Sequence, residues 1–154
     1  MFSQTTDWRY TSDAYQGPND MRHTVEVDLD DRAFLFPAGK PMTRLIYGAE
    51  GRTVDIDGIF PFNEARTRAR ILSLDIADAK DLARRLVDAV YQARTQHVIS
   101  DTARIAINVL TNGYHLQIGD LNHSTDVFLG TGCIWRVTQG LLRAVDHIAP
   151  IEAN

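Results

Sequence analysis

The sequence predicts an α+β fold, a two-layer sandwich in which a mainly antiparallel sheet carries two amphipathic helices on one face. Three observations predict it: short stretches with period-two alternation, two stretches with helical spacing at about 76–96 and 133–148, and an Asn112-Gly113 pair between two alternating runs. The 154 residues are 44% hydrophobic and 23% charged, close to the average globular domain. This composition excludes a disordered chain, a collagen-like repeat and a disulfide scaffold.

Residues 1–22 are predicted to form an N-terminal arm in front of a single domain at 23–150. The arm is polar and contains the breaker cluster Gly-Pro-Asn-Asp at 17–20. It nevertheless carries four aromatic residues, Phe2, Trp8, Tyr10 and Tyr15. A solvated tail rarely keeps so many, so we expect the arm to pack on its own body or on a partner subunit, and self-packing is the simpler case.

The first half of the domain reads as short strands. At 23–29, Val25, Val27 and Leu29 alternate with polar residues, which indicates a half-buried strand. Further strands are predicted at 33–36, 44–47, 53–57 and 67–74, separated by Pro, Gly and Asn breakers. The pattern does not set the order of these strands in the sheet.

A helix is predicted to follow, from Asp75 to about Gln96. The Asp75 carboxylate can accept from free backbone amides at the helix start, and Asp78 adds negative charge to the first turn. Apolar residues at i, i+3, i+4 and i+7 spacing form one stripe, made of Ala79, Leu82, Ala83, Leu86, Val90 and Ala93.

The dipeptide Asn112-Gly113 lies between alternating runs at 103–111 and 114–119. Asn-Gly in this position favours a type I′ hairpin turn. The register that this turn sets is Thr111–Tyr114, Val109–Leu116 and Ile107–Ile118. The paired apolar residues share a face, so the Asn-Gly turn and the alternation of apolar residues predict the same hairpin.

A third strand at 125–129 leads through Gly130 into the last helix, which Pro150 ends. One stripe of this helix consists of Ile134, Val137, Leu141, Val145 and Ile148. Trp135 and Leu142 widen the stripe, so we expect the helix to meet two neighbours. The sequence contains no internal repeat.

Cys133, at the first turn of the last helix, is a candidate nucleophile. A thiolate there would face free amides and the positive helix end, which lower the pKa of a thiol. The third strand returns antiparallel to the level of His115, which makes this histidine the candidate base. The opposing interpretation is that Cys133 is a small buried hydrophobe, as free cysteines usually are.

Arg66, Arg68 and Arg70 alternate along a predicted strand, so they form a short cationic ridge on one face. The ridge could meet acidic side chains, a phosphate-bearing ligand or RNA. The opposing interpretation is a solvated edge strand whose charges block edge-to-edge pairing.

Charge and motif content exclude several classes of function. With 16 basic and 20 acidic side chains the net charge is −4, which argues against a general nucleic-acid binder. A single cysteine forbids an intrachain disulfide and fits a reducing compartment. We expect a cytoplasmic protein, because no secretory signal or membrane-spanning run is present. The histidines lack metal-ligand spacing, so we expect neither a metal nor a cofactor.

The leading hypothesis is a cytoplasmic, non-enzymatic protein-interaction module, either a homo-oligomeric adaptor or an inhibitor or immunity-type binder. It depends on the aromatic arm with Trp8 and Tyr10, the wide apolar face of the last helix, the arginine ridge and the lack of a coherent catalytic set. Two alternatives remain open. One is a small acyl- or thiol-transfer enzyme using Cys133 and His115, and the other is a sensor of small anions or phosphorylated ligands using the arginine ridge.

Overall fold

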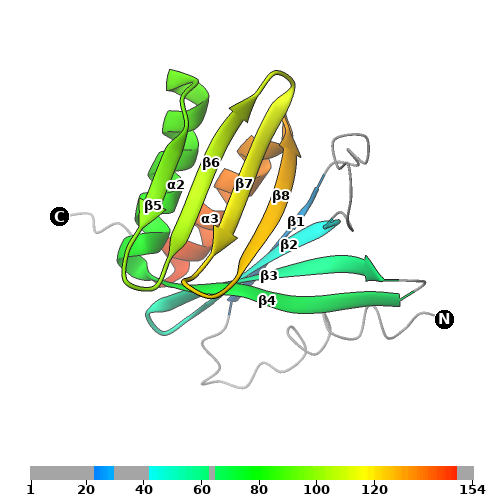
Figure 1. Ribbon diagram of the computed structural model, residues 1–154. Coiled ribbons are helices and arrows are strands. Elements are labelled where there is room, and N and C mark those ends of the chain that lie inside the picture. Colours follow the sequence, from blue (N-terminus) through cyan, green and yellow to red (C-terminus); the bar gives the residue numbers. More distant parts are fainter. Residues whose placement is uncertain (1–22, 30–41, 63–64, 149–154) are drawn as a thin grey trace.

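A computed structural model describes residues 23–29, 42–62 and 65–148 (Figure 1), with side chains undescribed at 61–67. The first four strands are β1 (His23–Asp28), β2 (Arg44–Glu50), β3 (Thr53–Phe62) and β4 (Ala65–Asp75). The next four are β5 (Gln96–Ile99), β6 (Arg104–Leu110), β7 (Gly113–Gly119) and β8 (Ser124–Gly130). The helices are α2 (Ile76–Gln92) and α3 (Cys133–Ile148). The predicted arm and the predicted strand at 33–36 lie outside the described residues.

The α+β class with antiparallel strands and two amphipathic helices is confirmed, but the strands form two sheets instead of one. Their orders are β1-β2-β3-β4 and β5-β6-β7-β8, with every neighbouring pair antiparallel. Both helices lie behind the second sheet in Figure 1. No helix in the described part of the chain is long and apolar enough to cross a membrane.

In the described part of the chain the order of elements repeats although the sequence does not: four antiparallel strands and a helix, twice. Each helix packs mainly on the sheet of the other half. Helix α2 contacts chiefly β5 and β6, whereas α3 contacts chiefly β1 and β2, and the two helices contact each other. The sheets therefore share one core instead of each closing over its own helix.

Helix α2 begins where the sequence predicts but ends earlier. The Asp75 carboxylate accepts a hydrogen bond of 2.8 Å from the Asp78 amide, which caps the helix. The helix ends at Gln92, and Ala93 adopts a left-handed conformation with φ 51°. The prediction ran on to Gln96 because Ala93 continues the apolar spacing, and it missed the four-residue strand β5.

The hairpin at 112–113 forms, with a register two residues away from the predicted one. Val109 faces Tyr114 and Ile107 faces Leu116, so the turn residues are Thr111 and Asn112. Neither has a positive φ, and the turn is therefore not type I′. Gly113 instead opens β7, where a Cβ would collide with the carbonyl oxygen of Leu129 on β8. A shift of two residues keeps every side chain on its face, so the predicted apolar face persists.

Helix α3 approaches β1 and β2 closely at one glycine. A Cβ on Gly140 would lie 2.6 Å from Cγ2 of Val27 and 3.1 Å from Cε2 of Tyr47. The buried Tyr47 hydroxyl donates a 2.9 Å hydrogen bond to the Val137 carbonyl. These contacts hold one side of α3 against the first sheet.

Candidate interaction surface

The structure does not bring Cys133 and His115 together. Cys133 has no exposed surface, and its Sγ lies 3.8 Å from the Asp28 carbonyl oxygen, because α3 turns its first residue into the core. His115 lies on the outer face of the second sheet, since Leu116 beside it points inward and neighbouring strand residues face opposite ways. The predicted thiol nucleophile is therefore enclosed and separated from its predicted base.

His115 has partners of its own on that outer face. Its ring stacks on Phe128 with centroids 4.6 Å apart. Asn108 Nδ2 lies 3.3 Å from Nδ1, and Asp126 Oδ1 lies 3.0 Å from Nε2. If Asn108 donates to Nδ1, then Nε2–H donates to Asp126. Both ring nitrogens are engaged in this arrangement, so the histidine offers no free base to a substrate.

The arginine ridge lies on β4, at one edge of the first sheet, and the charges of Arg68 and Arg70 are paired within the molecule. Arg68 Nε lies 2.8 Å from Asp57, and Arg70 forms ion pairs with Asp57 and, at 3.4 Å, with Asp55. Burial lowers the pKa of Arg70, but the hydrogen bond and charge of Asp57, followed by the charge of Asp55, outweigh it and raise the pKa overall. The side chain of Arg66 is outside the described residues, as are Trp8 and Tyr10 of the predicted arm.

A group of exposed apolar side chains joins the two helices. Tyr91 of α2 is 77% exposed, and its ring meets that of Trp135 of α3 edge-on, with centroids 6.0 Å apart. Leu142, seven residues after Trp135 and so on the same helix side, is 48% exposed. We call these three side chains the helix patch. As predicted, α3 meets more than one neighbour, but Trp135 and Leu142 stay partly exposed beside those contacts.

Charged residues of both signs border the helix patch on α2. Arg84 and Asp88 precede Tyr91 by seven and three residues, and they share its side of the helix. Arg84 Nη2 lies 3.2 Å from Asp81, in a surface pair that contributes little to stability. A border with both signs can meet a second copy of itself, because a two-fold contact places the basic group of one protomer opposite the acidic group of the other.

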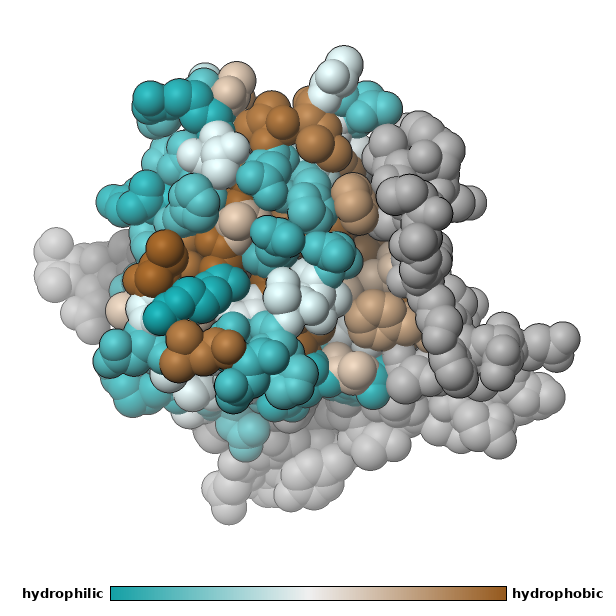
Figure 2. Space-filling view, in the orientation of Figure 1, coloured by the Kyte–Doolittle hydropathy of each residue, from teal (hydrophilic) through white to brown (hydrophobic). Residues whose placement is uncertain are grey.

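The outer face of the second sheet, seen in Figure 2, differs from the helix patch. Hydrophilic residues dominate this view, and apolar ones are interspersed among them. Ile99 and Leu110 are the large hydrophobic residues exposed on β5 and β6. Single exposed apolar residues of this kind are ordinary on protein surfaces.

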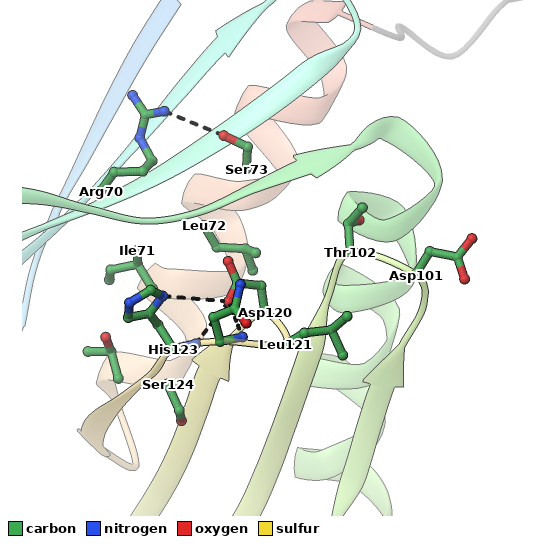
Figure 3. Close-up of a pocket in the computed structure, with 12 residues that line it drawn as sticks. Arg70, Ile71, Leu72, Ser73, Asp101, Thr102, Asp120, Leu121, His123 and Ser124 are labelled. Atoms are coloured by element: carbon green, nitrogen blue, oxygen red, sulfur yellow. Dashed lines mark hydrogen bonds and ion pairs between the residues drawn. The ribbon is translucent and has the colours of Figure 1, made fainter.

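A cavity of about 930 Å³ lies where the end of β4 meets the β5–β6 and β7–β8 loops (Figure 3). Several of its polar groups have partners within the protein, either in the cavity or, for Arg70 and Ser73, at Asp55 and Asp57 outside it. Asp120 Oδ1 accepts from the amides of Asn122 and His123 at 2.8 and 2.9 Å, and these hydrogen bonds lower the pKa of Asp120. On the opposite wall, Ser73 lies 3.4 Å from Arg70 Nη1. The side chains here do not converge as a nucleophile and base would.

The sequence interpretation missed Tyr91. Tyr91 follows Arg84 and Asp88 at helical spacing, on the side opposite the apolar stripe. A large aromatic residue on the polar side of a helix is the signal that could have identified the surface.

No protein-family model and no curated protein sequence matches the chain. Among solved structures, the chain aligns with a chain from crystal structures of Trypanosoma brucei MRP1/MRP2, with a TM-score of 0.42 and 14% identity, over 83% of this chain and 93% of that one.

Proposed function

We propose that this protein is a cytoplasmic, non-enzymatic interaction module that associates with a second copy of itself through the helix patch. The observation that carries the proposal is the exposed contact of Tyr91 with Trp135. Tyrosine and tryptophan are enriched among the residues that dominate binding energy at interfaces. Leu142 extends the apolar surface, and the mixed charges on α2 suit a self-complementary contact.

The alternatives have less support. A thiol enzyme needs an accessible nucleophile with a base in reach, and Cys133 is enclosed in the core. An anion sensor on the arginine ridge would have to compete with Asp57, whose side chain is 6% exposed between two arginines. An inhibitor or immunity-type binder would use the same helix patch for a different protein.

Sedimentation velocity of the full chain over a wide concentration range tests the proposal. We expect a reversible dimer that Leu142→Gln and Trp135→Gln each weaken. Leu121→Gln is the matched control, because Leu121 is 67% exposed in the β7–β8 loop, away from the helix patch. A chain that stays monomeric throughout, or a dimer that Leu142→Gln leaves intact, would overturn the self-association.

A further inference from the structure

A groove runs along β1 on the side of α3. Two cavities form it, of about 460 and 310 Å³, and together they line the whole strand from His23 to Asp28. They share Val25, Glu26 and Arg143 as lining residues, so they are neighbouring parts of one depression.

Among the strands that the structure describes, the strand wall of the groove is an edge of the first sheet, because β1 pairs with β2 on one side and is terminal in the strand order. The Leu29 amide donates to the Thr43 carbonyl at 3.0 Å, which continues the β1–β2 register. Hydrogen-bonding directions alternate along an antiparallel strand. Odd-numbered residues of β1 therefore turn their backbone groups to β2, and Thr24 turns its amide and carbonyl outward.

The helix wall of the groove offers hydrogen-bond donors. Gln139 and Arg143 line it, and neither has a hydrogen-bond or ion-pair partner among the residues that the structure describes. Arg136 already reaches the edge of β1, with its Nη2 3.5 Å from the Asp28 carbonyl. At the other end, His147 stacks on His23 with ring centroids 4.3 Å apart.

Charge selects the kind of partner. The carboxylates of β1 are both engaged, since Arg44 lies 3.1 Å from Glu26 and 2.7 Å from Asp28. The α3 wall carries Arg136 and Arg143 against the single carboxylate of Asp146. Glu26 and Asp28 alternate with Val25 and Val27, so their side chains point to the face away from α3. The balance is therefore positive on the α3 side of the groove alone, and that side favours acidic groups.

We propose that this groove binds an extended acidic peptide segment, which adds to β1 as a further strand. Main-chain hydrogen bonds to an exposed sheet edge supply affinity in such complexes, and alternate side chains supply specificity. Val25 and Val27 are buried toward α3, so the peptide side chains opposite them also turn toward α3. Acidic residues at every second position therefore meet Arg143 and Gln139. This site is separate from the helix patch.

Fluorescence anisotropy with a labelled Val-Glu-Val-Glu-Val-Glu peptide tests the proposal, with Val-Lys-Val-Lys-Val-Lys as the charge control. Thr24→Pro removes the outward amide at an edge position that tolerates proline, and Arg143→Glu reverses the charge of the α3 wall. We expect each variant to weaken binding about tenfold or more. Arg94→Glu, which makes the same charge change beyond the end of α2, leaves binding unchanged.

Three results would overturn the proposal: no binding of the acidic peptide, equal binding of the lysine peptide, or full binding by a folded Arg143→Glu variant. Circular dichroism establishes whether Thr24→Pro folds. If it folds and binds normally while Arg143→Glu does not, the contact is electrostatic and strand addition is wrong. If Thr24→Pro does not fold, a peptide N-methylated at alternate amides replaces it, and undiminished binding of that peptide contradicts strand addition.

Discussion

At the scale of single residues, the surroundings of Cys133 explain why a cysteine at a helix start is not necessarily reactive. The helix end would stabilise a thiolate, but Cys133 has no exposed surface and its Sγ faces the Asp28 carbonyl. In this structure Cys133, in the first turn of α3, faces the core. The sequence places the thiol at the helix start, but it does not show which way that turn faces.

We therefore expect Cys133 to react with an aromatic disulfide reagent at neutral pH only as fast as the protein opens. Reaction should be slow in buffer and complete within mixing time in denaturant, because the thiol is fully enclosed in the native state. Stopped-flow absorbance measures both rates. Fast native labelling with a depressed thiol pKa would contradict the enclosed site and restore the enzyme hypothesis.

The stacked pair of His23 and His147 makes stability depend on pH. Burial, and then the charges of His147 and Arg143, lower the pKa of His23 below its ordinary 6.5. The folded state therefore favours the neutral imidazole, and this contribution is present above pH 6.5 and is lost as the pH falls through the folded pKa. The carboxylate residues Glu26 and Asp146 also line this cavity.

We expect His23→Gln to flatten the fall in the free energy of unfolding below neutral pH. Urea titrations at a series of pH values measure it. His123→Gln is the control, because its side chain is 85% exposed, and its curve should follow that of the unmodified chain. A fall in stability that His23→Gln leaves unaltered would show that other groups cause it.

At the scale of elements, Gly140 determines how closely α3 approaches the first sheet. Alanine in place of glycine within a helix normally gains about 1 kcal/mol. Here the added Cβ would meet Val27 at 2.6 Å and the ring of Tyr47, which is held by its hydrogen bond to Val137. Overpacking of this kind costs about 1–3 kcal/mol.

We expect Gly140→Ala to lower the free energy of unfolding despite its better helix propensity, as measured by chemical denaturation. Gly132→Ala is the matched control, because a Cβ there has nothing within 4 Å. The double variant Gly140→Ala/Val27→Ala should lose less than the two single changes added together, since Val27→Ala makes room for the methyl group. Additive losses would mean that the two positions do not meet.

Local signals predicted some elements and not others. The cap at Asp75 and the apolar stripe of the last helix depend on neighbours three or four residues away, and both appear as predicted. The Asn-Gly turn was placed one residue too late, because the close approach of β7 to β8 requires glycine at 113 within the strand. That requirement comes from Leu129, sixteen positions later, whereas turn preferences consider only the residues of the turn itself.

At the scale of the whole molecule, the sequence predicts the class of the fold but not the number of sheets. The hairpin pattern provides one apolar face, and both helix stripes were assigned to it. In the structure α3 instead packs mainly on β1 and β2, more than eighty residues earlier in the chain. The helix patch is equally non-local, because Tyr91 and Trp135 meet only once both helices are in place.

This reciprocal packing predicts how the molecule behaves when it is divided. A cut between Ala93 and Arg94, in the exposed connection after α2, separates the two repeats of four strands and a helix. The first fragment loses α3, which covers β1 and β2, and the second loses α2, which covers β5 and β6. We therefore expect neither fragment to fold alone, and an equimolar mixture to recover the native far-ultraviolet circular dichroism and amide spectrum. Well-dispersed amide resonances from either fragment alone would show that each half forms its own core, contrary to the shared one.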